Sequence, residues 1–262
     1  NWEASVRPAF DEGRAVLLDD RWATAREDLA RIFAGATSAE SLAPERLRGA
    51  GQSLSELAKW YSANTSDAGL KDYFARVAQA ALEAAEGRFA GDVALVTGAA
   101  PHSIAAAVVG ELLAGGATVI MTSSRVNDAR LAFAKELYRT HAAIDATLWI
   151  VPANMASFRD VDALISWVGS EQTETHGATT EVVKPALLPD LFVPFAAPRV
   201  SGTVGSDPQG ALAQERLLLW SVERAIHLLS GLGADTAPNH RTHILLPGSP
   251  NRGIFGGDGA YG

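Results

Sequence analysis

Hydrophobic positions along the chain change their spacing near Gly91. Before it, they recur at the three- and four-residue intervals of amphipathic helices. One predicted helical face holds Trp22, Ala25, Leu29, Ile32 and Phe33, and another holds Leu70, Phe74, Val77, Ala81 and Ala84. Because alanine-rich stripes are typical of packing surfaces, residues 1–90 are predicted to be a helical lead-in or assembly segment without visible chemistry.

From Gly91 onward, short apolar runs alternate with amphipathic helices. The predicted strands are residues 92–97, 117–122, 147–152, 191–196 and 242–247, and the predicted helices are 104–114, 128–141, 158–168 and 210–231. Strands that are apolar on both faces indicate a parallel sheet covered by helices on both sides. We therefore predict an α/β domain over residues 91–262, with a doubly wound, Rossmann-like parallel sheet. Residues 170–189 lack this regularity and are expected to form a surface excursion.

Composition narrows the classes of partner. The formal charge is -8 at pH 7, which argues against nucleic acid or an anionic membrane as the main partner. The absence of cysteine excludes disulfides and zinc-thiolate sites, and the six histidines show no metal-ligand spacing. No apolar run reaches the ~18 residues of a membrane span, and no signal peptide is visible, so a cytoplasmic protein is expected. The start at Asn1 and the glycine-rich end, after five strands, suggest a C-terminally truncated piece of a longer chain.

The first predicted strand leads into a candidate nucleotide loop at residues 97–105. After Thr97, Gly98 permits a tight turn, and Ser103 is placed to begin a helix whose free N–H groups could face a pyrophosphate. The glycine pattern is incomplete, because His102 and Ala105 stand where dinucleotide loops often have glycine. An ordinary strand-to-helix turn is the alternative. The position in the first βα unit of a doubly wound pattern favours the nucleotide loop.

Residues after the next three strands suggest which cofactor is bound. Ser123, Ser124 and Arg125 follow the second strand, and their hydroxyls and guanidinium favour the 2′-phosphate of NADPH over the ribose diol of NADH. The alternative is a solvated loop arginine. Further candidate cofactor contacts are Asn154 and Met155 at the adenine, and Ala196 and Ala197 where the backbone would approach the cofactor closely.

A hydroxyl pair follows the fifth predicted strand. Ser249 and Tyr261 lie twelve positions apart in a glycine-rich stretch, the spacing at which short-chain dehydrogenases place the groups that polarise and protonate a carbonyl oxygen. A nearby cation would lower the pKa of the tyrosine from its unperturbed ~10. The lysine that usually does so, four positions after the tyrosine, lies beyond Gly262. The alternative to a catalytic pair is that Ser249 is a turn residue and Tyr261 a partly buried aromatic. We expect the 262-residue chain alone to be nearly inactive.

These stretches resemble the β-ketoacyl reductase domain of type I fatty acid synthases. The resemblance is carried by DVALVTGAAPHSIAAAVVGELLAGGATVIMTSSR, VPANMASFRDVDALISWVGSEQTE, FVPFAAPRV and LPGSPNRGIFGGDGAYG. It is closest to the mycobacterial and related actinobacterial single-chain synthases, and the fungal enzymes are more distant. It covers the chain densely from about residue 91 and more thinly before.

The resemblance implies NADPH-dependent reduction of a 3-oxoacyl chain on an acyl carrier protein, in a large cytosolic hexamer with other synthase domains. It implies that Ser249 and Tyr261 are catalytic and that Gly98, Ser103 and Ile104 belong to the nucleotide loop. Ser221 departs from the pattern, because many short-chain reductases have an asparagine there. The Ser-Ile-Ala turn is also similar to that of enoyl reductases, so an enoyl reductase stays open as an alternative. The second alternative is that the chain is a mainly structural segment of the synthase.

Overall fold

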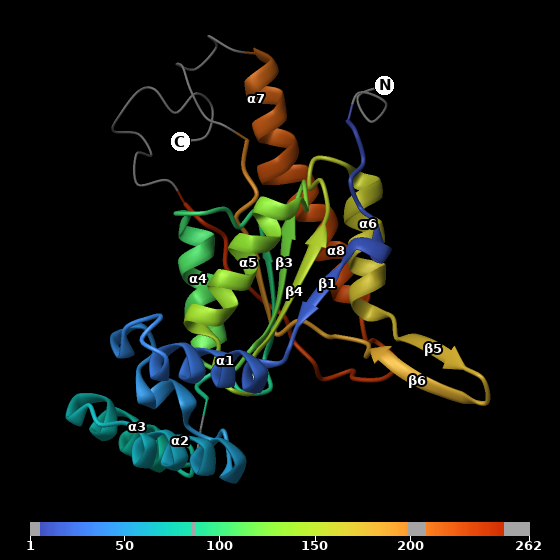
Figure 1. Cartoon of the computed structure of the whole chain (residues 1–262). Helices are drawn as coiled ribbons and strands as arrows, with labels where there is room; N and C mark the ends of the chain where they lie inside the picture. Colours follow the sequence, from blue (N-terminus) through green and yellow to red (C-terminus); the bar gives the residue numbers. More distant parts are fainter. Residues whose placement is uncertain (1–5, 85–86, 199–207, 249–262) are drawn as a thin grey trace.

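The computed structural model describes residues 6–84, 87–198 and 208–248, and it is built around a six-stranded sheet (Figure 1). The strands run in the order β1-β4-β3-β2-β7-β8, and every neighbouring pair is parallel except β1 with β4. Their bounds are Val16–Leu18 (β1), Val93–Thr97 (β2), Thr118–Ser123 (β3), Thr147–Pro152 (β4), Leu191–Pro194 (β7) and His243–Ile244 (β8).

Helices cover both faces of this sheet, as the two-sided apolar strands predicted. Helices α4 (Ile104–Ala114) and α5 (Asp128–His141) pack on one face, and α6 (Phe158–Gly169) and α8 (Ser221–Gly231) pack on the other. Alternate residues of each strand point to opposite faces, so Val96 joins the first core and Leu95 the second. The central strands are therefore buried on both sides.

The strand order reverses at β2. From β2 the chain moves outward to β3 and then β4, after which it returns to the other side of β2 to form β7 and then β8. This reversal is the topological switch point of a doubly wound fold, where ligands bind outside the carboxyl ends of the strands. The predicted architecture is confirmed for the described residues.

One strand contradicts the helical interpretation of the first 90 residues. Strand β1 pairs antiparallel with β4, with Val16 opposite Ile150, and so the chain before α1 belongs to the sheet. Three residues are too few to show a period of two, and the partner strand lies more than 100 residues away. Local sequence could not reveal this pairing.

The rest of the N-terminal part is helical, as predicted, and has a core of its own. It comprises α1 (Arg21–Phe33), α2 (Gln52–Asn64) and α3 (Ala68–Ala80), with short 3-10 turns at Glu12–Arg14 (η2), Ala39–Ser41 (η3) and Pro44–Leu47 (η4). Ala25, Leu29, Ile32, Phe74 and Val77 are buried in this core, whereas Ala84 is exposed. Figure 1 shows α1, α2 and α3 beyond the amino ends of the parallel strands, at the opposite end of the sheet from their carboxyl ends.

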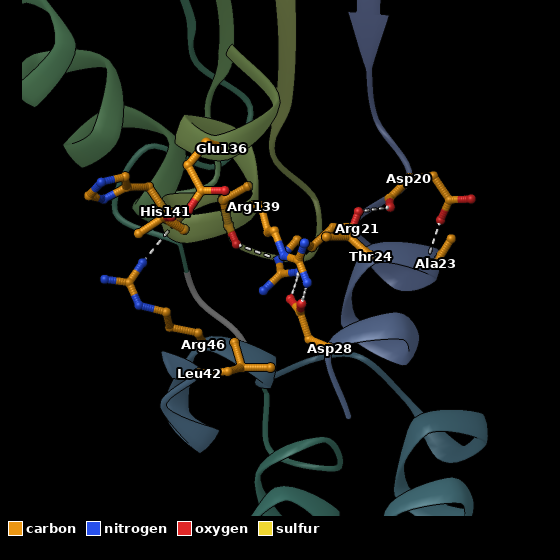
Figure 2. A network of polar contacts seen from close by, with 12 residues as sticks. Asp20, Arg21, Ala23, Thr24, Asp28, Leu42, Arg46, Glu136, Arg139 and His141 are labelled. Atoms are coloured by element: carbon orange, nitrogen blue, oxygen red, sulfur yellow. Dashed lines mark hydrogen bonds and ion pairs between the residues drawn. The ribbon is translucent and has the colours of Figure 1, made fainter. Parts of the chain in front are cut away.

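Charged residues join this helical unit to the α5 side of the sheet (Figure 2). Buried Asp28 on α1 contacts the guanidinium of Arg139 on α5 and lies 3.8 Å from Arg21 Nη1. Arg21 Nε donates to the carbonyl of Ala142 at 3.0 Å, and Arg46 Nη1 donates to that of His141 at 3.1 Å. The junction is therefore polar and specific rather than a continuous apolar core.

Two further segments differ in detail from the prediction. Residues 170–189 do leave the sheet, but they form a regular hairpin of β5 (Gln172–His176) and β6 (Thr179–Lys184). The long helix expected at 210–231 is divided into α7 (Pro208–Glu215), a π-helical turn η5 (Arg216–Trp220) and α8. Over the described residues, no helix combines the length and the apolar character needed to cross a bilayer.

Candidate functional site

A cavity of about 250 Å³ lies at the carboxyl ends of β2, β3, β4 and β7, at the switch point of the sheet. Seven residues that the sequence assigned to a cofactor line it together: Gly98, Ser123, Ser124, Asn154, Met155, Ala196 and Ala197. They come from four segments spread over about 100 residues. The structure therefore brings most of the predicted cofactor residues together, because each follows a strand and the carboxyl ends of the parallel strands meet.

Gly98 allows β2 and β7 to end against each other. Its φ is +75°, and a Cβ atom built on it would lie 2.5 Å from Ala196 Cα and 2.7 Å from Ala196 N. Thr97 Oγ1 accepts a hydrogen bond from the Ala196 N–H at 3.2 Å, so its buried side chain joins the two strand ends instead of lining the cavity. Glycine is required here both by its conformation and by the close backbone approach.

The loop after Gly98 is closed by Ser103. Its hydroxyl donates to the Ala100 carbonyl at 2.7 Å and caps α4 by accepting from the Ala106 N–H at 3.1 Å. His102 has φ +61°, so it adopts the left-handed conformation that glycine often supplies. Ile104 is 73% exposed, and neither it nor Ser103 lines the cavity. The turn therefore connects β2 tightly to α4, with Ser103 as the capping residue of the helix.

The turn after β3 separates Arg125 from the other predicted residues. Ser123 Oγ donates to the Arg125 carbonyl at 2.9 Å, whereas exposed Ser124 reaches the cavity edge. The exposed Arg125 lines a second, neighbouring cavity of about 710 Å³, which Ser124 and Asn154 also line. Arg125 thus lies beside the first cavity and not within it.

Two charged residues near the site escaped the sequence interpretation. Arg130, in the first turn of α5, lines the first cavity and donates from Nη1 to the Ala99 carbonyl at 3.3 Å. Asp160, buried on α6, accepts from the Asn154 N–H at 2.8 Å and so fixes the loop that carries Asn154 and Met155. The only feature of the sequence that could have indicated them is that each lies in the first turn of a helix that follows a strand.

Comparisons with known proteins can now be set beside this geometry. No family model matches the sequence. The fatty acid synthase alpha subunit aflA of Aspergillus parasiticus is 38% identical over 178 residues, and the fatty acid synthase subunit alpha of Schizosaccharomyces pombe is 37% identical over 174. These matches cover 66% and 64% of this chain but 10% and 9% of the relatives, so the chain spans about a tenth of their length. Both are fungal, and the mycobacterial type stays a prediction.

A solved short-chain type dehydrogenase/reductase from Mycobacterium ulcerans is similar with a TM-score of 0.51, at 17% identity, covering 66% of this chain and 57% of that one. The strand order and the switch point of the sheet indicate the same fold as this solved structure. The chain has the short-chain dehydrogenase fold. At this level of identity the likeness establishes architecture and not activity.

Ser221 is the first residue of α8. It follows the π-helical turn η5, its side chain is buried, and its hydroxyl makes no hydrogen bond within the described residues. Arg216, at the start of that turn, donates to the Ala156 carbonyl and lies 4.2 Å from the centre of the Phe158 ring. The turn is thereby tied to the loop that carries Met155.

Ser249 and Tyr261 lie outside the described residues, so their catalytic role stays a prediction. The described chain reaches Gly248, immediately before Ser249. In the described ranges, no group of three or more His, Cys, Asp or Glu side chains could hold a metal ion.

Proposed function

We propose that this chain is the ketoreductase segment of a fatty acid synthase, which reduces a 3-oxoacyl group on an acyl carrier protein to the 3-hydroxyacyl group with NADPH. The observation that carries the proposal is the cavity at the switch point, lined by seven residues that the sequence assigned to a cofactor. Similarity to a segment of fatty acid synthase alpha subunits supports the reaction class.

The residues present fit a dinucleotide. Gly98 makes the tight turn that ends β2, and the N-terminus of α4, which begins three residues after the loop's Pro101, could face a pyrophosphate. Ser123, Ser124 and Arg125 would hold the 2′-phosphate end, with Asn154 and Met155 at the adenine. Ala196 and Ala197 would leave room for the nicotinamide half, and Thr97, Ser103 and Ile104 would support the loop.

The bound cofactor would supply hydride to the carbonyl carbon. Negative charge then grows on the carbonyl oxygen, where Ser249 would donate a hydrogen bond and Tyr261 would donate the proton that completes the alcohol. These two roles rest on sequence spacing and on the resemblance to ketoreductases.

The test is NADPH oxidation by the parent synthase with a 3-oxoacyl thioester and, in parallel, a 2-enoyl thioester. We expect reduction of the 3-oxoacyl substrate to fall by at least about 100-fold in Tyr261→Phe, because the proton donor is lost, while NADPH binding persists. Full activity in this variant would refute the assignment. Reduction at this site of only the enoyl substrate would support the alternative, an enoyl reductase with the same Ser-Ile-Ala turn.

The wider setting belongs to the same proposal. Partners would be the acyl carrier protein and other synthase domains, in a cytoplasmic hexamer of the actinobacterial single-chain type. Residues 1–90 would contribute an assembly surface and residues 91–262 the reductase.

Deletion of residues 21–84, which removes α1 to α3 but keeps β1, tests the structural role of the first 90 residues. An unchanged oligomer size by light scattering would contradict that role.

A further inference from the structure

The second cavity brings together three arginines from two distant segments. Arg7 and Arg14 come from the chain before β1, and Arg125 comes from the turn after β3. Ser124 and Asn154 line this arginine cavity and also the first cavity, so the two adjoin at the carboxyl ends of β3 and β4.

Hydrogen bonds to a buried carboxylate hold the N-terminal segment in place here. The carboxylate of Asp160, 1% exposed, accepts from the N–H groups of Ala9 at 2.6 Å and Phe10 at 2.9 Å, in addition to that of Asn154. The Asn154 side-chain amide donates to the Arg7 carbonyl at 2.9 Å. One buried carboxylate thus fixes both the N-terminal segment and a predicted adenine-contacting loop, so the two surfaces keep a defined relation.

A second contact fixes the other end of the segment. The guanidinium of Arg14 donates to the Val126 carbonyl, next to Arg125, and β1 then continues along β4. The segment from Arg7 to Arg14 is therefore attached to the ends of both β3 and β4. Its arginines are held beside Arg125 by the fold itself.

The charge around the arginine cavity is unbalanced. Its lining has three guanidinium groups and one carboxylate, that of Asp11, which accepts from the Gly13 N–H at 3.1 Å as the cap of η2. Over the described residues, no carboxylate lies within 4.0 Å of the guanidinium nitrogens of Arg7, Arg14 or Arg125. In a chain of net charge -8, such a local excess of positive charge favours a compact anion of more than one charge.

We infer that Arg7 and Arg14 join Arg125 in binding the 2′-phosphate of NADPH, so that the segment before β1 forms part of the cofactor site. This rests on the proposed function. A phosphate monoester is a near-dianion at neutral pH, and guanidinium groups bind its oxygens in pairs. Asn154 and Ser124 border both cavities, so an adenosine held at these two residues would lie next to the cavity that the three arginines line.

The experiment measures binding by calorimetry to the purified 262-residue chain. The probes are NADPH and NADH, and the smaller pair adenosine 2′,5′-bisphosphate and 5′-AMP. The variants are Arg7→Gln, Arg14→Lys, Arg125→Gln and the control Arg76→Gln. The control loses one exposed charge on α3, at the far end of the molecule (Figure 1).

Wild type should prefer each 2′-phosphorylated probe. Arg7→Gln should weaken NADPH binding by about tenfold and leave NADH binding within about twofold, since one charge-assisted contact to the 2′-phosphate is lost. Arg7 is the best position for this test, because within the described residues only its backbone carbonyl forms a hydrogen bond. Arg14→Lys retains the charge but not the paired geometry, and it should weaken the same probes less.

Three outcomes would overturn the inference. Unchanged NADPH affinity in Arg7→Gln with weakened affinity in Arg125→Gln would confine the phosphate to the β3 turn and leave the proposed function intact. Equal weakening of NADPH and NADH would show a structural effect. A wild-type chain that binds neither nicotinamide nucleotide would overturn the proposed function together with the inference.

Discussion

At the scale of single residues, Gly98 leaves no room for a side chain. Gly98→Ala would place a methyl group 2.5 Å from Ala196 Cα at a φ of +75°. We expect a loss of at least about 2 kcal/mol in the free energy of unfolding, because both strain and displacement of β7 must be accommodated. Urea denaturation measures this loss, and nucleotide titration should show weakened binding in parallel.

Gly231→Ala is the matched control. The glycine ends α8, and no heavy atom lies within 4 Å of its added Cβ. Its stability should change by less than about 1 kcal/mol. A loss of stability in Gly98→Ala as small as that of this control would contradict the close approach of β2 and β7 at Gly98.

Asp160 tests the second residue-scale feature, the buried carboxylate between three backbone N–H groups. Asp160→Ala leaves those donors without their acceptor, and we expect a loss of about 3 kcal/mol in unfolding free energy. Asp162→Ala, two positions along α6, removes only an exposed pair with Arg224 and should cost less than about 1 kcal/mol. Chemical denaturation of both variants compares them; similar losses would contradict the role of Asp160.

The same residues show how far sequence reasoning could go at this scale. Ser123, Asn154 and Ala196 were predictable because each follows a strand, and the carboxyl ends of parallel strands meet. Asp160 was not, because its partner Ala9 lies 151 positions away. Arg130 looked like an ordinary solvent-facing helix residue, since the periodic pattern of a helix does not show what its first turn faces.

At the scale of elements, the β5–β6 hairpin is anchored by one lysine. Lys184 is fully buried, and its Nζ donates to the carbonyls of Val168, Ser170 and Pro185 at 3.2, 2.7 and 3.0 Å. It also lies 4.6 Å from the centre of the Trp167 ring. It therefore joins the end of the hairpin to the C-terminal turn of α6. Burial lowers the pKa of its amine from 10.5 to about 8.

This lowered pKa predicts a dependence of stability on pH. Between pH 8 and 10.5 the unfolded chain holds the Lys184 proton and the folded chain releases it, so this residue's contribution to stability rises with pH across that window. The unfolding free energy of wild type relative to Lys184→Met should therefore increase from pH 7.5 to pH 9.5. Guanidinium titrations at several pH values measure the difference, with Lys135→Met, an exposed lysine on α5, as control. A difference that stays constant with pH would contradict the prediction.

Elements were predictable where they were long and periodic. Helices α4, α5 and α6 match the expected ranges to within about a residue, because their apolar faces repeat over three turns. The hairpin was missed because its residues are mostly exposed and carry no buried face. The π-helical turn at η5 was missed because the positions Leu218, Val222 and Ala225 fit an uninterrupted helix equally well.

At the scale of the whole molecule, the helical unit and the sheet meet through the Asp28 junction (Figure 2). The carboxylate faces two arginines, of which Arg21 is fully buried and lacks hydrogen bonds from its two terminal nitrogens within the described residues. Burial lowers the pKa of Arg21, because the low-dielectric surroundings disfavour its charged form. The helices on both sides of this junction could be predicted from the sequence. Their contact could not, because Asp28 and Arg139 are 111 positions apart.

Asp28→Ala should therefore destabilise the assembly of the two parts. It leaves a buried guanidinium without a counter-ion, and we expect a loss of about 3 kcal/mol in unfolding free energy. Arg139→Gln should cost clearly less, because Asp28 retains Arg21, and Glu83→Ala, which removes an exposed pair with Arg48, should cost less than about 1 kcal/mol. Urea unfolding followed by circular dichroism and tryptophan fluorescence ranks the three variants. The order Asp28→Ala, Arg139→Gln, Glu83→Ala follows only if the carboxylate compensates a buried charge. Equal losses for the first two variants would instead indicate that the Asp28–Arg139 contact accounts for the whole loss and that Arg21 needs no counter-ion.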